Sequence, residues 1–112
     1  MKYLKLVINN KKNLNKFFNK KELQTILDLY AQMVSTGEWK DYGLHLSKQE
    51  ISFNIYKRSS EVPVYKIMKS LNPKNENNKY FVKDSNGNII KSSENLKSLI
   101  QNVRWARFKL VN

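Results

Sequence analysis

The chain has 112 residues, of which 40% are hydrophobic and 12% aromatic, and it carries a formal net charge of +12. This length supports one ordinary domain, and the apolar content is sufficient for a folded core, so disorder of the whole chain is excluded. With no cysteine and a single histidine, His45, the sequence excludes disulfides, thiolate catalysis, sulfur-bound zinc and histidine-built metal cages.

Residues 1–17 are a basic arm rich in Asn and Lys, and we expect residues 18–112 to form one compact domain. No apolar run approaches the roughly 20 residues of a membrane span, and the N-terminal apolar stretch is too short and too interrupted by lysine for a secretory signal. We therefore expect a cytoplasmic protein. The preference for Lys over Arg is typical of an A/T-rich coding sequence, but it does not explain why only 9 acids oppose 21 bases.

The first predicted element is an amphipathic helix over residues 20–36. Asn19 is a good N-cap, and Glu22 stands where a capping-box carboxylate belongs. Phe18 and Leu23 can close a hydrophobic staple before the helix, and Gly37 supplies its left-handed end. Apolar residues recur at helical spacing and predict the buried face: Leu23, Ile26, Leu27, Tyr30, Met33 and Val34.

After this helix the apolar period changes to that of a β-strand. We predict strands over 43–46, 51–57, 62–68, 80–83 and 89–91, with a loop over 70–78. Pro63 indicates an edge or the opening of its strand, and Asn86-Gly87 predicts a hairpin turn.

A second helix is predicted after residue 91, with Ser92 or Ser93 as its cap and Leu96, Leu99, Ile100 and Val103 on its inner face. Residues 104–110 either continue that helix or form a last strand. The predicted fold class is therefore α+β: an N-terminal amphipathic helix, an antiparallel β-meander and a C-terminal helix.

Four stretches carry a resemblance to a known family: FNKKELQTILDLYAQMVSTGEWKDY (18–42), FNIYKRSSEVPVYKI (53–67), KYFVKDSNGNIIK (79–91) and ENLKSLI (94–100). In these stretches the chain resembles an alphaproteobacterial family known as domain of unknown function 2794. GEWKDY and YKRSSEVPVYKI are the most specific parts. The resemblance implies one compact domain over roughly 18–100, and it implies no mechanism because the family has no established activity.

Candidate catalytic residues are few. Glu38, Asp41 and His45 could form an acid–base or metal site only if they converged in one pocket, whereas carboxylates near a loop more often cap turns or pair with lysines. Glycines occur only at 37, 43 and 87, so no Walker loop, Rossmann glycine pattern or EF-hand loop is possible. We expect a non-enzymatic protein without cofactor or metal.

Aromatic residues interleaved with bases indicate contacts to nucleic acid, because rings stack on bases while ammonium and guanidinium groups hold phosphates. Trp39 and Phe53 are assigned to the core instead. The alternatives at two candidate segments are structural: Arg58 can pair with Glu61 across a turn, and Trp105 with Phe108 can dock on the sheet. The candidate nucleic-acid-binding residues are Lys11, Lys12, Lys16, Tyr56, Lys57, Arg58, Arg104, Trp105, Arg107 and Lys109.

The leading hypothesis is a small binding module that associates with RNA or DNA through charge contacts to the backbone. The competing hypothesis is a protein–protein adaptor, in which Tyr56, Trp105 and Phe108 anchor an acidic protein partner. The placement of the lysines discriminates the two, because nucleic-acid binding needs them on one face.

Overall fold

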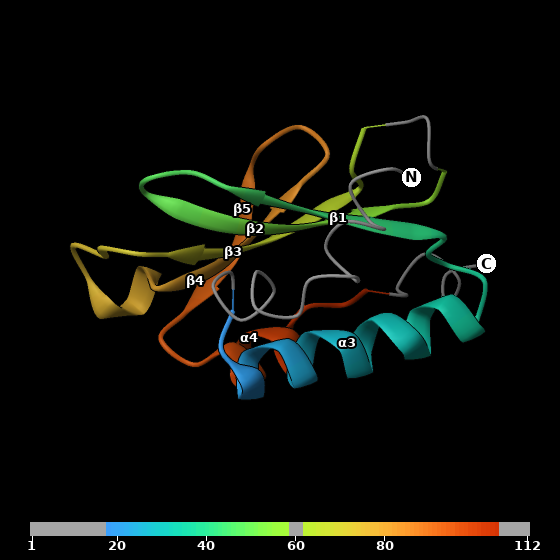
Figure 1. Cartoon of the computed structure of the whole chain (residues 1–112), viewed down its shortest axis with the longest axis horizontal. Coiled ribbons are helices and arrows are strands. Elements are labelled where there is room, and N and C mark those ends of the chain that lie inside the picture. Colours follow the sequence, from blue (N-terminus) through green and yellow to red (C-terminus); the bar gives the residue numbers. More distant parts are fainter. Residues whose placement is uncertain (1–17, 59–61, 106–112) are drawn as a thin grey trace.

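The computed structural model describes residues 18–58 and 62–105. Its elements follow in the order α3 (Lys20–Ser35), β1 (Asp41–Leu46), β2 (Glu50–Tyr56), β3 (Tyr65–Ser70), the 3₁₀ turn η1 (Glu76–Asn78), β4 (Tyr80–Asp84), β5 (Ile89–Ser93) and α4 (Leu96–Asn102). The strands form one antiparallel sheet in the order β1-β2-β3-β4-β5 (Figure 1). The α+β prediction, with a helix, a meander and a C-terminal helix, is confirmed.

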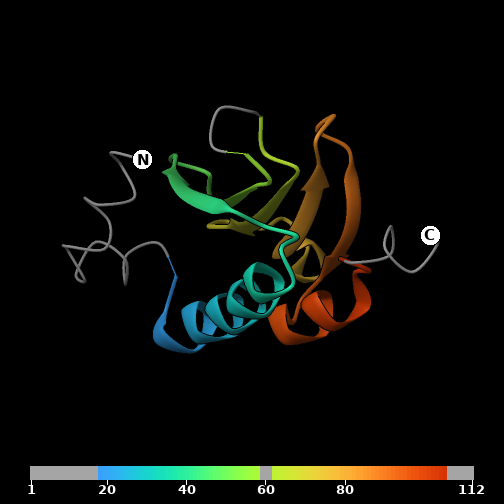
Figure 2. The ribbon, with the colours of Figure 1, turned by 90° about the vertical axis from the view of Figure 1, so that its right-hand side faces the viewer.

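Helices α3 and α4 lie side by side beneath one face of the sheet, and no described helix lies over the opposite face (Figure 2). Within the described ranges, neither helix has the length and apolarity needed for a membrane crossing. The fold therefore has two layers, with the hydrophobic core between the helices and one face of the sheet.

Helix α3 begins as the sequence predicts. The Asn19 side chain accepts a hydrogen bond from the Glu22 amide at 2.8 Å, and the Glu22 carboxylate accepts one from the Asn19 amide at 2.7 Å. This reciprocal pair is a capping box. The buried face differs in part from the prediction, since Leu29 is buried and Val34 is exposed.

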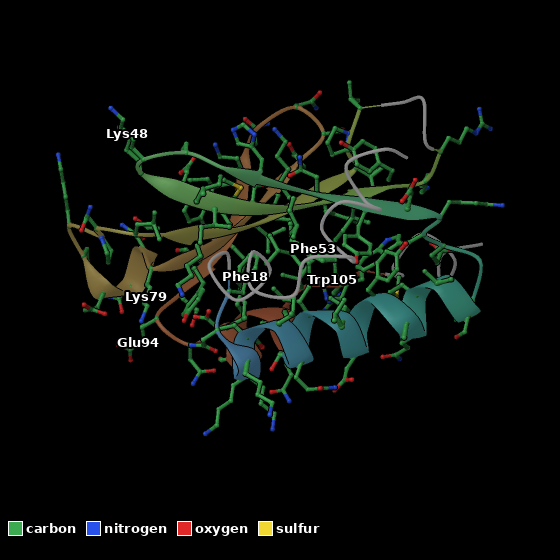
Figure 3. The ribbon with its side chains drawn as sticks, viewed as in Figure 1. Phe18, Lys48, Phe53, Lys79, Glu94 and Trp105 are labelled. Carbon is green, nitrogen blue, oxygen red and sulfur yellow. The ribbon has the colours of Figure 1, made fainter. Side chains whose placement is uncertain are left out.

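The core forms because alternate residues of each strand face the helices. In the central row Phe53 lies between Leu44 of β1 and Ile67 of β3. Phe18, Phe53 and Trp105 lie between the sheet and the helices (Figure 3) and are buried. The assignment of Trp39 and Phe53 to the core is confirmed.

Strand β3 begins at Tyr65, later than predicted. Val64 donates a backbone hydrogen bond to Ile55, whereas Val62 is exposed and Pro63 has no N–H to donate. Pro63 thus precedes the strand, and the strand is central rather than an edge.

The cap of α4 also differs from the prediction. Ser92 and Ser93 are paired with β4 in the ladder, and Asn95 caps the helix by accepting a hydrogen bond from the Ser98 amide at 2.9 Å. The helix ends at Asn102, because Val103 has extended backbone angles. Arg104 and Trp105 therefore do not continue α4, and residues 106–110 lie outside the described residues.

Candidate functional site

The face of the sheet away from the helices, here called the open face, carries residues that alternate with the core residues of each strand. The register aligns them in rows, and two central rows extend across all five strands. One row contains Gly43, Asn54, Lys66, Lys83 and Ile89, and the next contains His45, Ser52, Met68, Phe81 and Ser92. The first row is thus polar and basic over β2, β3 and β4 and ends at the exposed Ile89 of β5, and the second row is partly apolar.

Lys66 of β3 and Lys83 of β4 are direct cross-strand partners in the first row. Both side chains are half-buried. The Lys83 ammonium lies 5.8 Å from the centre of the Phe81 ring, and the ring itself is only 9% exposed. The Lys83 ammonium is therefore placed for a cation–π contact with Phe81.

A shallow hollow of about 290 Å³ lies at this lysine pair. It is lined by His45, Glu50, Ser52, Asn54, Lys66, Met68 and Lys83. The Ser52 hydroxyl donates a hydrogen bond to the Asn54 side-chain oxygen, and the amide nitrogen of Asn54 remains available as a donor. The centre of the hollow is therefore rich in cations and hydrogen-bond donors.

Glu50 is the acidic residue of the hollow, and it lies at the far end of β2. Four residues separate it from Asn54, which is the neighbour of Lys66, and at about 3.3 Å per residue the two backbone positions are about 13 Å apart. The lysine pair thus has no acid in its own row of the described sheet.

A second charged cluster lies on the opposite, helix-covered face. Glu22 of α3 is buried, and its carboxylate accepts hydrogen bonds from Lys69 Nζ at 2.8 Å and from the Tyr80 hydroxyl. Burial raises the pKa of Glu22, but the hydrogen bonds from Lys69, Tyr80 and the Asn19 amide outweigh it and hold the pKa below its usual range. Among the described residues no buried side-chain nitrogen or oxygen lacks a partner, so this cluster is a satisfied connection between helix and sheet.

The structure brings part of the predicted site together at another edge of the molecule. Lys57, which follows β2, and Trp105, which follows α4, line one cavity of about 330 Å³. Arg104 lines a neighbouring cavity of about 380 Å³. Tyr56 ends β2 and is half-buried, and Arg58 is exposed beside Lys57.

Trp105 is not available for base stacking, because it is only 7% exposed. Its indole N–H donates to the Ile100 carbonyl at 3.0 Å, and its ring packs edge-on against Trp39 and Tyr65 with ring centres 5.5 and 5.0 Å apart. The sequence leaves open whether Trp105 contacts nucleic acid or docks on the sheet, and in the structure it is docked. Trp105 therefore leaves the set of contact residues and joins the core.

The edge around Lys57 and Arg104 has mixed charge. Glu38 and Asp84 line the first cavity together with Lys57, and Asp84 also lines the second with Lys91 and Arg104. A polyanion approaching this edge meets both signs of charge. The hollow on the open face also has an acid in its lining, Glu50, but no acid of the described sheet shares the row of its lysine pair.

Five predicted contact residues lie outside the described residues: Lys11, Lys12, Lys16, Arg107 and Lys109. The acid–base hypothesis concerned Glu38, Asp41 and His45. In residues 18–58 and 62–105 no three histidine or acidic side chains are grouped so as to hold a metal ion, so these three do not form such a site.

Lys66 and Lys83 are absent from the predicted site. The runs around them, VYKIMK (64–69) and YFVKD (80–84), do not alternate strictly between apolar and polar residues, so neither run shows which face its lysine occupies. The two lysines are brought together by the pairing of β3 with β4, which are separated by a long loop. This pairing cannot be predicted from either run of residues alone.

Comparison with known proteins gives a family. The sequence profile described as "Protein of unknown function (DUF2794)" matches residues 16–100. No curated protein and no solved structure matches the chain. The match covers α3, every strand and most of α4, which means that the open face lies wholly within it. The chain belongs to the DUF2794 family.

Proposed function

We propose that this protein is a small non-enzymatic module of the cytoplasm that associates with nucleic acid, RNA or DNA, through its phosphate backbone. The observation that carries the proposal is the pairing of Lys66 with Lys83 on the face of the sheet that no described helix covers. Such cations neutralise phosphates and release their condensed counterions, which supplies most of the free energy of sequence-independent binding.

The state of the aromatic rings supports contact with the backbone rather than with bases. Phe81 is the ring beside the lysine pair; it is buried, and the Lys83 ammonium lies over it. Trp105 is buried in the core, and Tyr56 is half-buried. With these rings engaged, the described part of the chain offers charge and hydrogen bonds to a nucleic acid more readily than a stacking platform.

The net charge of +12 supports the same proposal. Charges remote from the contact still raise the local concentration of a polyanion and speed its encounter with the protein. Lysines also occur at the rim of the sheet, such as Lys48 at the β1–β2 turn and Lys79 just before β4, which lie at the same end of the sheet (Figure 3). These lysines attract a polyanion without forming a defined site. The proposal therefore depends on the lysine pair and not on the total charge.

The test is fluorescence anisotropy of labelled single-stranded RNA and duplex DNA with the full chain, over a series of salt concentrations. We expect the logarithm of the affinity to fall linearly with the logarithm of salt concentration, with little dependence on base sequence. Absence of salt-sensitive binding to both polymers at low ionic strength would overturn the proposal. A protein partner would then be sought by pull-down, with the mixed-charge edge around Lys57 and Arg104 as the docking surface.

A further inference from the structure

We propose that the hollow on the open face is a phosphate-binding subsite, in which Lys66, Lys83 and Asn54 hold one phosphate group. This inference rests on the proposed function. It specifies where a phosphate group binds and that the hollow holds one such group. It concerns a defined pocket rather than general attraction of polyanions to a basic surface.

The two charges are placed for a shared ligand. Direct cross-strand partners have Cα atoms about 4.5–5.5 Å apart, so the ammonium groups of Lys66 and Lys83 can converge on one group. Like charges that face each other across an antiparallel pair destabilise a sheet. A bound phosphate relieves this repulsion, because it supplies the negative charge that is absent from the row.

The hydrogen-bonding groups of the row also suit an anion. The side-chain oxygen of Asn54 is occupied by the Ser52 hydroxyl, which orients the amide nitrogen as a donor. Asn54 is the direct partner of Lys66, so this donor and the two ammonium groups belong to one row. A phosphate has only acceptor oxygens when it is ionised as a diester, and this row presents donors.

The size of the hollow fits a small group. It measures about 290 Å³, and pockets for drug-sized ligands are about 300–1,000 Å³. A phosphate group with a few waters fits a volume at the lower limit, whereas a buried nucleotide base needs a deeper and more apolar site. Two of its lining residues, Ser52 and Met68, are buried.

The phosphate can belong to the diester backbone of a nucleic acid or to a free phosphate. Both sources share the chemistry that the row recognises. The experiment therefore has two arms, one with a labelled oligonucleotide and one with inorganic phosphate, and both use the full chain.

Three variants make the test specific. Lys66→Met/Lys83→Met removes both charges and keeps the apolar stems. Lys21→Met/Lys97→Met is the matched control, since it removes two exposed charges from α3 and α4 on the other side of the molecule. Asn54→Asp places a carboxylate beside the lysines; we expect it to preserve the fold, since it changes one atom group, and to abolish anion binding.

In the oligonucleotide arm the readout is the slope of log affinity against log salt. Loss of the one phosphate contact should lower the magnitude of the slope by about 0.7 for a single strand or about 0.9 for a duplex. We expect this change in Lys66→Met/Lys83→Met and no comparable change in the control. In the inorganic phosphate arm, NMR titration should give saturable shifts of the backbone amides of residues 54, 66 and 83, absent with chloride at equal ionic strength and lost in Asn54→Asp.

The outcomes separate the two proposals. If the polymer binds but the open-face variant behaves like the control, and phosphate shifts no amide of the hollow, the subsite is overturned and the proposed function stands. If inorganic phosphate saturates the hollow while no polymer binds, the subsite stands for a free phosphate and the proposed function falls. If neither ligand binds, both are overturned.

Discussion

Replacement of Glu22 by glutamine tests how the helix layer is attached to the sheet. The carboxylate accepts hydrogen bonds from Lys69, Tyr80 and the Asn19 amide, and it forms an ion pair with Lys69 at 2.8 Å. Gln keeps the shape but loses the charge, and it leaves Lys69 without this counterion on the helix-covered face. The perturbation therefore acts on one connection between α3 and strands β3 and β4.

The expected cost follows from the burial of the pair. Breaking a fully buried pair costs about 3–5 kcal/mol, and a hydrogen bond to a charged group contributes about 1.5–3 kcal/mol. The Lys69 side chain retains 18% exposure and can recover some hydration. We therefore expect Glu22→Gln to lower the free energy of unfolding by about 2–3 kcal/mol, a large fraction of the roughly 5–15 kcal/mol of a typical domain.

Urea unfolding followed by tryptophan fluorescence is the assay, since Trp39 and Trp105 are both buried in the core and become exposed on unfolding. Lys69→Met and the double variant complete a thermodynamic cycle. We expect the double variant to be at least about 1 kcal/mol more stable than the sum of the single effects predicts, because Met no longer needs a counterion. A loss below about 0.5 kcal/mol in Glu22→Gln, or additive single effects, would refute the reasoning.

The same carboxylate should make stability depend on pH. Its folded-state pKa lies below the ordinary value of 4.5, so the folded protein holds the charged form more strongly than the unfolded chain does. The stabilisation is present above about pH 4.5 and is lost as the pH falls through the lowered pKa. The stability difference between the natural chain and Glu22→Gln should therefore shrink on acidification, and a difference that grows below pH 4.5 would contradict the assigned sign.

Three further predictions concern the core, a turn and the tyrosines. Trp105→Ala should cost about 3–5 kcal/mol in urea unfolding, and Trp105→Phe less, because Ala loses the packing as well as the hydrogen bond to Ile100. Gly87→Ala should cost about 1–2 kcal/mol although no atom lies within 4 Å of the added Cβ, because the φ of +85° strains an L-residue; a cost near zero in thermal unfolding would contradict this. Burial raises the pKa of Tyr30 to about 12 and also raises those of Tyr42 and Tyr80. Absorbance at alkaline pH should show these tyrosines ionising later than in urea, with stability falling as the pH rises above 10.

Local signals account for the elements that the sequence predicts well. The start of α3 depends on Asn19 and Glu22, which are three residues apart and bond to each other. The β4–β5 turn depends on Gly87, whose positive φ the Asn-Gly pair indicates. Such interactions span only a few residues, so the residue types and their spacing in the sequence are enough to predict them.

Contacts with other elements of the fold explain why some of the sequence-based predictions are wrong. Ser92 and Ser93 are residue types that often cap helices, but both are paired with β4 in the sheet. Asn95 therefore caps the helix instead. Trp105 stands in a basic stretch that is typical of a contact surface, yet its ring has partners on the sheet and in the loop after α3. In each case the deciding contact comes from another element of the fold.

The two lysines of β3 show why a list of bases could not predict the site. Lys66 and Lys69 are three residues apart and therefore point to opposite faces of the strand. Lys69 is neutralised by Glu22 beneath the helices, whereas Lys66 faces Lys83 on the open face. The same charge thus stabilises the fold in one position and, in the proposed subsite, binds phosphate in the other. Lys69→Met should weaken the fold with little effect on the salt slope of nucleic-acid binding, and Lys66→Met/Lys83→Met should do the reverse, since it removes a repulsion from the sheet and a contact from the ligand.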